Sequence, residues 1–179
     1  MLHIITPYRP DKDLGKAYND AISLIPDGDF VCLMDIDAMF LTPDAPEMIE
    51  KYAEMHPDSL LTCYCNRVSP LAHEQLLGGV SENSDILHHI EKAQKQKLLF
   101  PRSTKIHRGE ISGYLMVFKK DLWEQNKFDE GIGCLAVDTF WSRRFIVMGR
   151  DIIRMDAVYI WHTYRIWKDI KDKSHLMQK

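Results

Sequence analysis

The segment Phe30–Met34 (FVCLM) is apolar at every position, and it constrains the fold more than any other part of the chain. A strand covered on both faces has an unbroken apolar run, whereas a strand with one wet face alternates. Asp35-Ile36-Asp37 follow this run directly. The pattern predicts a sheet with helices on both faces, in which Asp35 and Asp37 stand at the carboxyl end of a central strand. In open α/β sheets this is the end where ligands bind.

The rest of the chain alternates between strand and helix patterns, as an α/β fold requires. Further strands are predicted at Leu2–Thr6, Ser59–Tyr64, Gly113–Phe118, Ile152-Ile153 and Ala157–Trp161. Helices are predicted at Leu14–Ile25 with Asp13 as the cap, Thr42–Met55 with a hydroxyl cap, Ser84–Leu98 with Ser84 as the cap, Lys119–Gln125 and Asp138–Val147. The third of these helices is expected to turn His88 and His89 toward solvent. We predict one α/β domain over residues 1–179, with residues 166–179 as a tail.

Composition excludes several classes of protein. The 179 residues carry 23 Lys and Arg against 26 Asp and Glu, a net charge of −3, whereas a nucleic-acid-binding protein needs a basic surplus. No apolar stretch approaches the roughly 20 residues of a membrane span, and there is no signal-peptide pattern. None of the 4 cysteines forms a C-x-x-C pair, which favours buried thiols in a reducing compartment. We therefore expect a cytoplasmic protein, free or peripheral to the inner face of the membrane, with no transmembrane segment and no nucleic-acid partner.

Asp35-x-Asp37 and His162 are candidate metal ligands. Two carboxylates one residue apart can both reach a divalent cation, and oxygen ligands suit Mg²⁺ or Mn²⁺. The alternative interpretation is a turn in which they accept loop N–H groups. His162 ends an apolar strand as a potential imidazole ligand, and Arg165 follows at a spacing that allows it to pair with a diphosphate. The alternative there is a histidine that caps the strand beside a surface arginine.

Asp138 is a candidate general base. It follows the small and apolar segment Gly131–Val137 and stands at the start of a predicted helix. A carboxylate in this position can project into a cleft and accept a proton. The alternative interpretation is an ordinary helix N-cap, where Asp is favoured.

The order of these motifs resembles nucleotide-sugar glycosyltransferases of the GT-A fold, and is most similar to the family 2 type. The matching segments are Leu14–Ala21 with its Asn19, Gly113–Lys119 as an acceptor-side strand, Phe128-Asp129-Glu130 as an FDE turn, and Asp138 with Arg144 as the acidic helix. Val158–Arg165 is similar to the strand–His–x–x–Arg ending of the polypeptide N-acetylgalactosaminyltransferases. The resemblance covers most of residues 1–165 and lies in motif order more than in any one motif.

This resemblance implies a compact, Rossmann-like GT-A fold, a mixed sheet flanked by helices. It also implies that part of the usual N-terminal nucleotide-binding half is missing, because Pro7-Tyr8-Arg9 leads almost directly to the Asn19 helix. Val137 and Phe140 stand where the family places acidic residues. The domain is thus expected to be a reduced member of the fold.

The implied activity is transfer of a sugar, with inversion, from a nucleoside-diphosphate sugar to a hydroxyl acceptor. A UDP-sugar is the favoured donor, and the acceptor is a saccharide, a lipid-linked group or a protein. The implied residues are Asp35, Asp37 and His162 for Mn²⁺ or Mg²⁺, Thr6, Pro7, Tyr8, Arg9, Asn19, Asp35 and Arg165 for the donor, and Asp138 as the base. Because His162 must be neutral to bind metal, activity is expected to fall below about pH 6.

Two other functions are compatible with these motifs. One is a catalytically degenerate domain that binds a nucleotide sugar or a partner. The other is a phosphatase, because Met34–Ala38 also resembles the haloacid-dehalogenase motif, in which the first Asp is the nucleophile.

Overall fold

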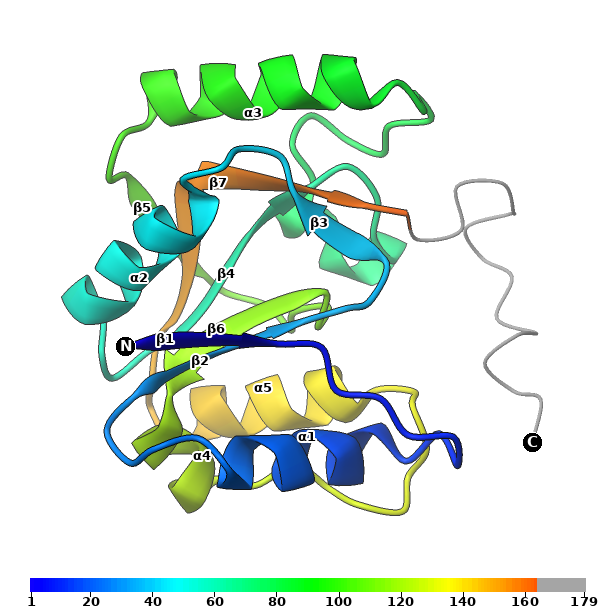
Figure 1. The fold of residues 1–179 in the computed structure, drawn as a ribbon, viewed down its shortest axis with the longest axis vertical. Helices are drawn as coiled ribbons and strands as arrows, with labels where there is room; N and C mark the ends of the chain where they lie inside the picture. The colour runs from blue at the N-terminus through cyan, green and yellow to red at the C-terminus, as the bar shows by residue number, and fades with distance from the viewer. Residues whose placement is uncertain (164–179) are drawn as a thin grey trace.

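The computed structural model describes residues 1–163, apart from the side chains of Pro70 and Leu71. Within them, one mixed sheet of 7 strands has the order β1-β2-β6-β4-β7-β3, with β5 also paired to β7 (Figure 1). The strands are β1 (Leu2–Ile5), β2 (Phe30–Met34), β3 (Ala38–Phe40), β4 (Leu60–Cys65), β5 (Thr104–His107), β6 (Leu115–Lys119) and β7 (Ile152–His162). The helices are α1 (Leu14–Ser23), α2 (Ala45–Met55), the 3₁₀ helix η1 (Pro70–Gln75), α3 (Ile86–Leu99), α4 (Lys120–Gln125) and α5 (Val137–Val147). The predicted α/β class, a mixed sheet flanked by helices, is confirmed.

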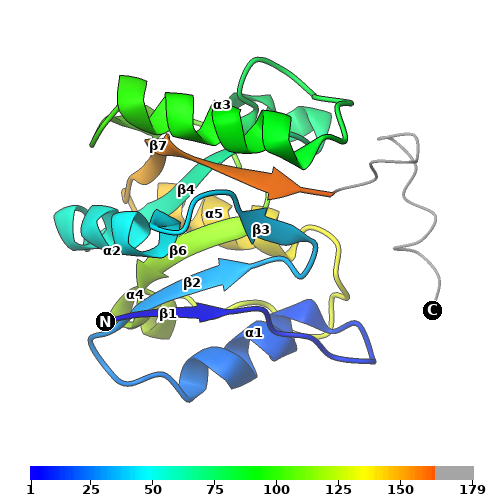
Figure 2. The same cartoon turned by 45° about the horizontal axis from the view of Figure 1, so that its top comes forward.

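Helices cover both faces of the sheet. Helices α1, α4 and α5 lie on one face and α2 lies on the other, while α3 packs against β7 at the far end of the sheet (Figures 1 and 2). Strand β2 shows why its sequence is apolar throughout. Phe30 and Cys32 pack in the cluster that contains α2, whereas Val31 and Leu33 pack in the cluster that contains α1 and α5. Both faces of β2 are therefore buried, as its sequence predicted.

Strand direction gathers several loops at one edge of the sheet. Strands β1, β2, β4 and β7 run parallel, while β6 runs antiparallel to its neighbours β2 and β4. The carboxyl ends of four strands and the amino end of β6 consequently meet at the same edge. Asp35, Asn66 and His162 stand there, together with Gly113 just before β6.

The last strand differs from the prediction of two short strands. β7 is continuous over 11 residues, but its register with β4 shifts between Met155 and Tyr159. The polar residues Arg154 and Asp156 do not interrupt it, because the Arg154 guanidinium donates two hydrogen bonds, of 3.0 and 2.9 Å, to Asp156 Oδ1. Arg154 and Asp156 thus balance each other's charge within the strand. A register shift relative to β4 stands where a break was predicted.

Strands β3 and β5 were not predicted. Both are short, with 3 and 4 residues, and both pair antiparallel with β7. Segments of this length carry too few positions for a period-2 pattern to stand out. Their pairing depends on the distant strand β7 and not on local sequence.

The start and the inner face of α3 also correct the prediction. Asp85, and not Ser84, is its N-cap, and the Asp85 side chain accepts a hydrogen bond of 2.9 Å from Leu87 N. His89 does not point to solvent: it is buried, with Nδ1 at 2.6 Å from the Tyr159 hydroxyl. This side of α3 packs on β7, which a mostly polar helix sequence does not reveal. Helix α2 likewise takes Asp44, and not a hydroxyl residue, as its N-cap.

Two other expectations concern the thiols and the membrane. Cys32, Cys63 and Cys65 are buried free thiols, as predicted. No helix within residues 1–163 has both the length and the apolar character that crossing a bilayer demands.

Candidate functional site

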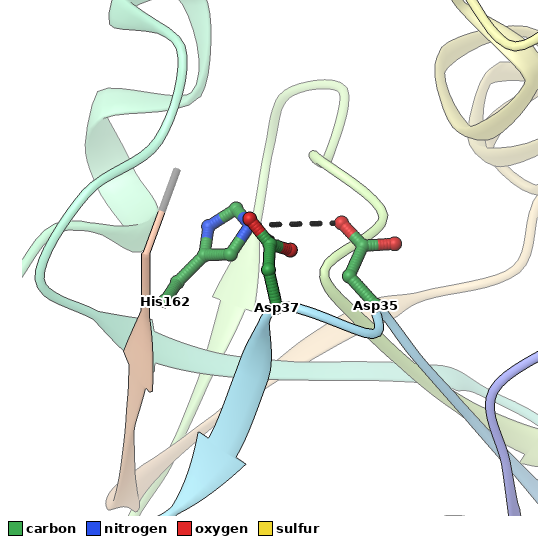
Figure 3. A group of neighbouring side chains, drawn as sticks. All are labelled: Asp35, Asp37 and His162. Atoms are coloured by element: carbon green, nitrogen blue, oxygen red, sulfur yellow. Dashed lines mark ion pairs between the residues drawn. The ribbon is translucent and has the colours of Figure 1, made fainter. Parts of the chain in front are cut away.

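Strand pairing brings the two predicted aspartates to the predicted histidine. β3 pairs antiparallel with β7, with Ala38 opposite His162, so Asp37 lies beside the imidazole. Thr163 N continues this ladder by donating to Asp37 O at 2.9 Å. His162 Nε2 is 3.3 Å from Asp37 Oδ1 and 3.6 Å from Asp35 Oδ2. Figure 3 shows the two carboxylates beside the imidazole. Residues 125 positions apart in sequence thus form one cluster.

This cluster fits a divalent cation. One ligand atom from each of the three residues lies within 4.8 Å of the other two. Ligands at about 2.1 Å from an octahedral ion are about 3.0 Å apart when adjacent and about 4.2 Å apart when opposite. Two carboxylates and one imidazole are a donor set that suits Mn²⁺ or Mg²⁺. Three protein ligands leave positions in the octahedron for oxygen atoms of a substrate.

The end of β4 orients the imidazole. His162 Nδ1 lies 2.8 Å from the Arg67 carbonyl oxygen. Because a carbonyl only accepts, Nδ1 is the donor, and Nε2 is the nitrogen that carries the lone pair in the neutral ring. The His162 backbone N–H donates to Asn66 Oδ1 at 2.6 Å. Such outer contacts commonly fix a metal-binding histidine. Sequence reasoning missed both residues, although they directly follow a strand that ends at this edge.

Charges in the cluster change its protonation. Burial lowers the pKa of His162, but a hydrogen bond to Asp37, a contact with Cys65 and the two negative charges outweigh it and raise this pKa to about 10. Burial raises the pKa of Asp35 to about 6, helped by the charges of Asp37 and Asp138. Burial also acts to raise the pKa of Asp37, but hydrogen bonding to His162 lowers it overall. Without a metal, the raised pKa favours the protonated imidazole at neutral pH, so a metal ion must compete with a proton for Nε2 well above pH 6.

Metal affinity should consequently rise with pH. From about pH 6.5 to about pH 8.5 the ion must displace one proton from His162, so the association constant should increase about tenfold per pH unit. Below about pH 6, Asp35 also takes up a proton, and the dependence should steepen toward two protons. Calorimetry with Mn²⁺ in buffers of different ionisation enthalpy measures both the affinity and the protons released. A pH-independent affinity without proton release would contradict the assignment of His162 as a ligand.

A cavity of about 730 Å³ adjoins the cluster. Its volume lies in the range of small-molecule sites and is far larger than one ion needs. The predicted site residues that line it are Pro7, Tyr8, Arg9, Asp35, Asp37, Asp138 and His162. Thr6 and Asn19 are not part of its wall. Arg165 lies outside the described residues.

The residues that line the cavity come from different parts of the chain. The loop after β1 supplies Tyr8, which is 73% exposed, and Arg9. Arg9 pairs with Asp11 at 2.8 Å and with Asp20 at 3.1 Å, so its charge is largely balanced within the protein. Tyr18 of α1 adds a second aromatic ring to the lining. Residues 110–113, residues 134–136 and the first turns of α5 also line the cavity.

Asn19 has a structural role that the prediction did not foresee. Its side-chain oxygen accepts from Trp123 Nε1 at 2.9 Å and from Phe128 N at 3.1 Å. Its amide donates to Phe128 O at 3.0 Å and to Glu130 Oε1 at 2.9 Å. These hydrogen bonds of the buried Asn19 side chain join α1 to the loop before α5. They give no support to the predicted contact of Asn19 with a donor.

Asp138 lies in the cavity wall within the first turn of α5. The N-cap position of this helix belongs to Ala136, so the interpretation of Asp138 as the N-cap residue is wrong. Asp138 Oδ2 accepts from Gly113 N at 2.6 Å, and Oδ1 accepts from Thr139 N at 2.8 Å. Burial raises the pKa of Asp138 although these N–H groups act to lower it. The carboxylate therefore has the position and the raised proton affinity that a general base needs.

Gly113 makes the close approach to Asp138 possible. A Cβ atom at position 113 would lie 2.8 Å from Asp138 Cβ and 3.2 Å from Asp138 Oδ2, so any side chain would push the carboxylate away. The charge of Asp138 also raises the pKa of Asp35, as expected for two carboxylates that face one cavity. Sequence reasoning missed this role of Gly113, although a glycine just before a buried strand is a usable signal.

Arg144 takes no part in the cavity wall. Its guanidinium donates to Asn126 Oδ1 at 2.5 Å, to Asp129 Oδ2 at 2.6 Å and to Lys127 O at 2.7 Å. These three contacts hold α5 against the segment that precedes it. The role of Arg144 is to position the helix that carries Asp138.

Comparison of the sequence with models of known protein families and with curated proteins gave no match. The site itself combines three clustered ligand side chains, a cavity beside them and a buried carboxylate in the wall of that cavity.

Proposed function

We propose that this protein is a metal-dependent glycosyltransferase that moves a sugar from a nucleoside-diphosphate sugar to a hydroxyl acceptor. The observation that carries the proposal is that one cavity contains both a possible metal-binding group and a buried carboxylate. The group Asp35, Asp37 and His162 can hold a divalent cation, and Asp138 offers a carboxylate whose pKa is raised. The GT-A fold that the motif order resembles is part of this proposal.

In this proposal the metal-binding group and the loop after β1 bind the nucleotide-sugar donor. Asp35, Asp37 and His162 would hold Mn²⁺ or Mg²⁺, which when bound neutralises the diphosphate as the bond to the sugar breaks. Tyr8 lies exposed at the cavity, where its ring is available to stack on the base, with a UDP-sugar as the favoured donor. Arg9 adds N–H donors to the same wall.

In this proposal Asp138 is the general base that accepts the proton of the acceptor hydroxyl. A carboxylate with a raised pKa binds a proton more readily than an ordinary one, so it can take the proton of a hydroxyl as that oxygen attacks the sugar. Hydrogen bonds from Gly113 N and Thr139 N fix the orientation of both carboxylate oxygens. Attack from the side opposite the diphosphate would invert the anomeric carbon.

Donor turnover tests this proposal. The protein is incubated with UDP-glucose, UDP-galactose, UDP-N-acetylglucosamine and GDP-mannose, and release of the nucleoside diphosphate is measured with Mn²⁺, with EDTA, and after Mn²⁺ is restored. We expect release from at least one donor, loss of release with EDTA and recovery with Mn²⁺. Asp121→Asn, at a half-exposed carboxylate in the first turn of α4, is the matched control and should release as much as the wild type.

Two further measurements, of donor binding and of phosphate release from an aryl phosphate, separate the alternatives. Metal-dependent binding of a donor without any release would contradict the enzyme proposal and favour a degenerate binding domain. Phosphate release from an aryl phosphate, with none of the four donors cleaved, would favour the phosphatase.

A further inference from the structure

We infer that Phe140, Arg143 and Glu110 form the acceptor subsite and that this subsite binds a neutral saccharide. The inference rests on the proposed function and narrows its acceptor to one chemical class. All three side chains line the same cavity as Asp138.

The segment before β6 runs alongside the first turns of α5 and contacts them at two points. Gly113 N contacts Asp138 Oδ2 at 2.6 Å, and three residues earlier Glu110 Oε1 accepts from Arg143 Nε at 2.5 Å. Asp138, Arg143 and Glu110 line the same cavity of about 730 Å³, which is large enough for a pyranose ring. We assign one hydroxyl of the bound sugar to Asp138 and another to the Arg143–Glu110 pair.

Phe140 adds an apolar surface to the same cavity. Phe140 and Arg143 are three positions apart and so share one side of α5. The guanidinium carbon of Arg143 lies 5.9 Å from the centre of the Phe140 ring, and the Phe140 side chain remains 43% exposed. The apolar C–H face of a pyranose packs well on an aromatic ring of this kind, while the hydroxyl groups at its edge need hydrogen-bonding partners.

The charges favour a neutral ligand. Arg143 directs its Nε and Nη2 groups to the same oxygen of Glu110, so the pair carries no net charge. The guanidinium has further N–H donors and Glu110 has a second acceptor oxygen, which together match hydroxyl groups that both donate and accept. A phosphate or carboxylate on the acceptor would instead meet the negative charge of Glu110 near that of Asp138.

Binding of simple sugars tests the inference. Saturation-transfer NMR and titration are performed with Mg²⁺ and UDP present, using methyl β-glucopyranoside, methyl β-galactopyranoside, methyl α-mannopyranoside and methyl N-acetyl-β-glucosaminide. We expect at least one of them to bind the wild type. Phe140→Ala should weaken it about tenfold and Arg143→Met about fivefold, whereas Phe140→Tyr should keep it within about twofold because the ring remains.

Val147→Ala is the control, because this residue is 86% exposed at the far end of the same helix. Binding of Mg²⁺ and UDP is measured on every sample by calorimetry. If the wild type binds Mg²⁺ and UDP but none of the four glycosides, or if Phe140→Ala and Arg143→Met bind them as tightly as the wild type, the subsite is refuted and the proposed function is not. If the wild type binds neither Mg²⁺ nor UDP, the proposed function itself fails. Stronger binding of a Ser- or Thr-containing peptide than of any glycoside would also overturn the inference.

Discussion

Asp138→Asn should lower kcat for sugar transfer by about a thousandfold while leaving the affinity for Mn²⁺ and UDP within about twofold of the wild type. An amide has nearly the shape of a carboxylate, but it cannot accept the proton of the acceptor hydroxyl. Its NH₂ group would also face one of the two backbone N–H donors, of Gly113 or Thr139, that now bind the carboxylate. Transfer is measured with the best donor and acceptor, and metal and nucleotide binding by calorimetry.

Asp121→Asn again provides the control, since it makes the same chemical change in the first turn of another helix. Transfer by Asp138→Asn at the wild-type rate would refute its role as the base. Equal loss of UDP affinity and transfer would instead assign Asp138 to donor binding.

Asp37→Ala and His162→Ala should each weaken Mn²⁺ binding by at least about a hundredfold and remove the metal-dependent part of UDP binding. Each substitution deletes one of three ligand side chains, and two ligands hold an ion poorly. Asp37→Asn tests the same point with little change in shape. Calorimetric titration of Mn²⁺, first alone and then with UDP, measures both effects.

His88→Ala is a suitable control, because this histidine is exposed on α3 and lies outside the cluster. Circular dichroism must show that the His162 variant is folded, since the imidazole is buried. If folded Asp37→Asn and His162→Ala bound Mn²⁺ as tightly as the wild type, there would be no metal site at this position.

The sequence predicts the strands whose apolar residues are contiguous. β2 and β6 are evident because both faces of each are covered, so no polar residue interrupts them. Asp35 and Asp37 could be placed at a ligand-binding edge because they follow such a strand. Their assignment to one site with His162 came from the resemblance of the motif order to GT-A glycosyltransferases.

Side-chain direction could not be predicted in the same way. His89 and Asn19 are polar residues on helices, and sequence alone does not show which neighbour each one meets. His89 contacts Tyr159 of β7, and Asn19 contacts the loop at Phe128. Both contacts join residues 70 or more positions apart, so they depend on the assembled fold.

The irregular register of β7 has a consequence for sequence comparison. Residues 156–158 have no counterparts in β4, and they act as a spacer that sets how far His162 extends toward Asp37. Because successive side chains in a strand point to opposite sides, adding or removing one residue here would turn the imidazole away from the carboxylates. In related chains the length of this interval should therefore be kept more strictly than the residues that fill it.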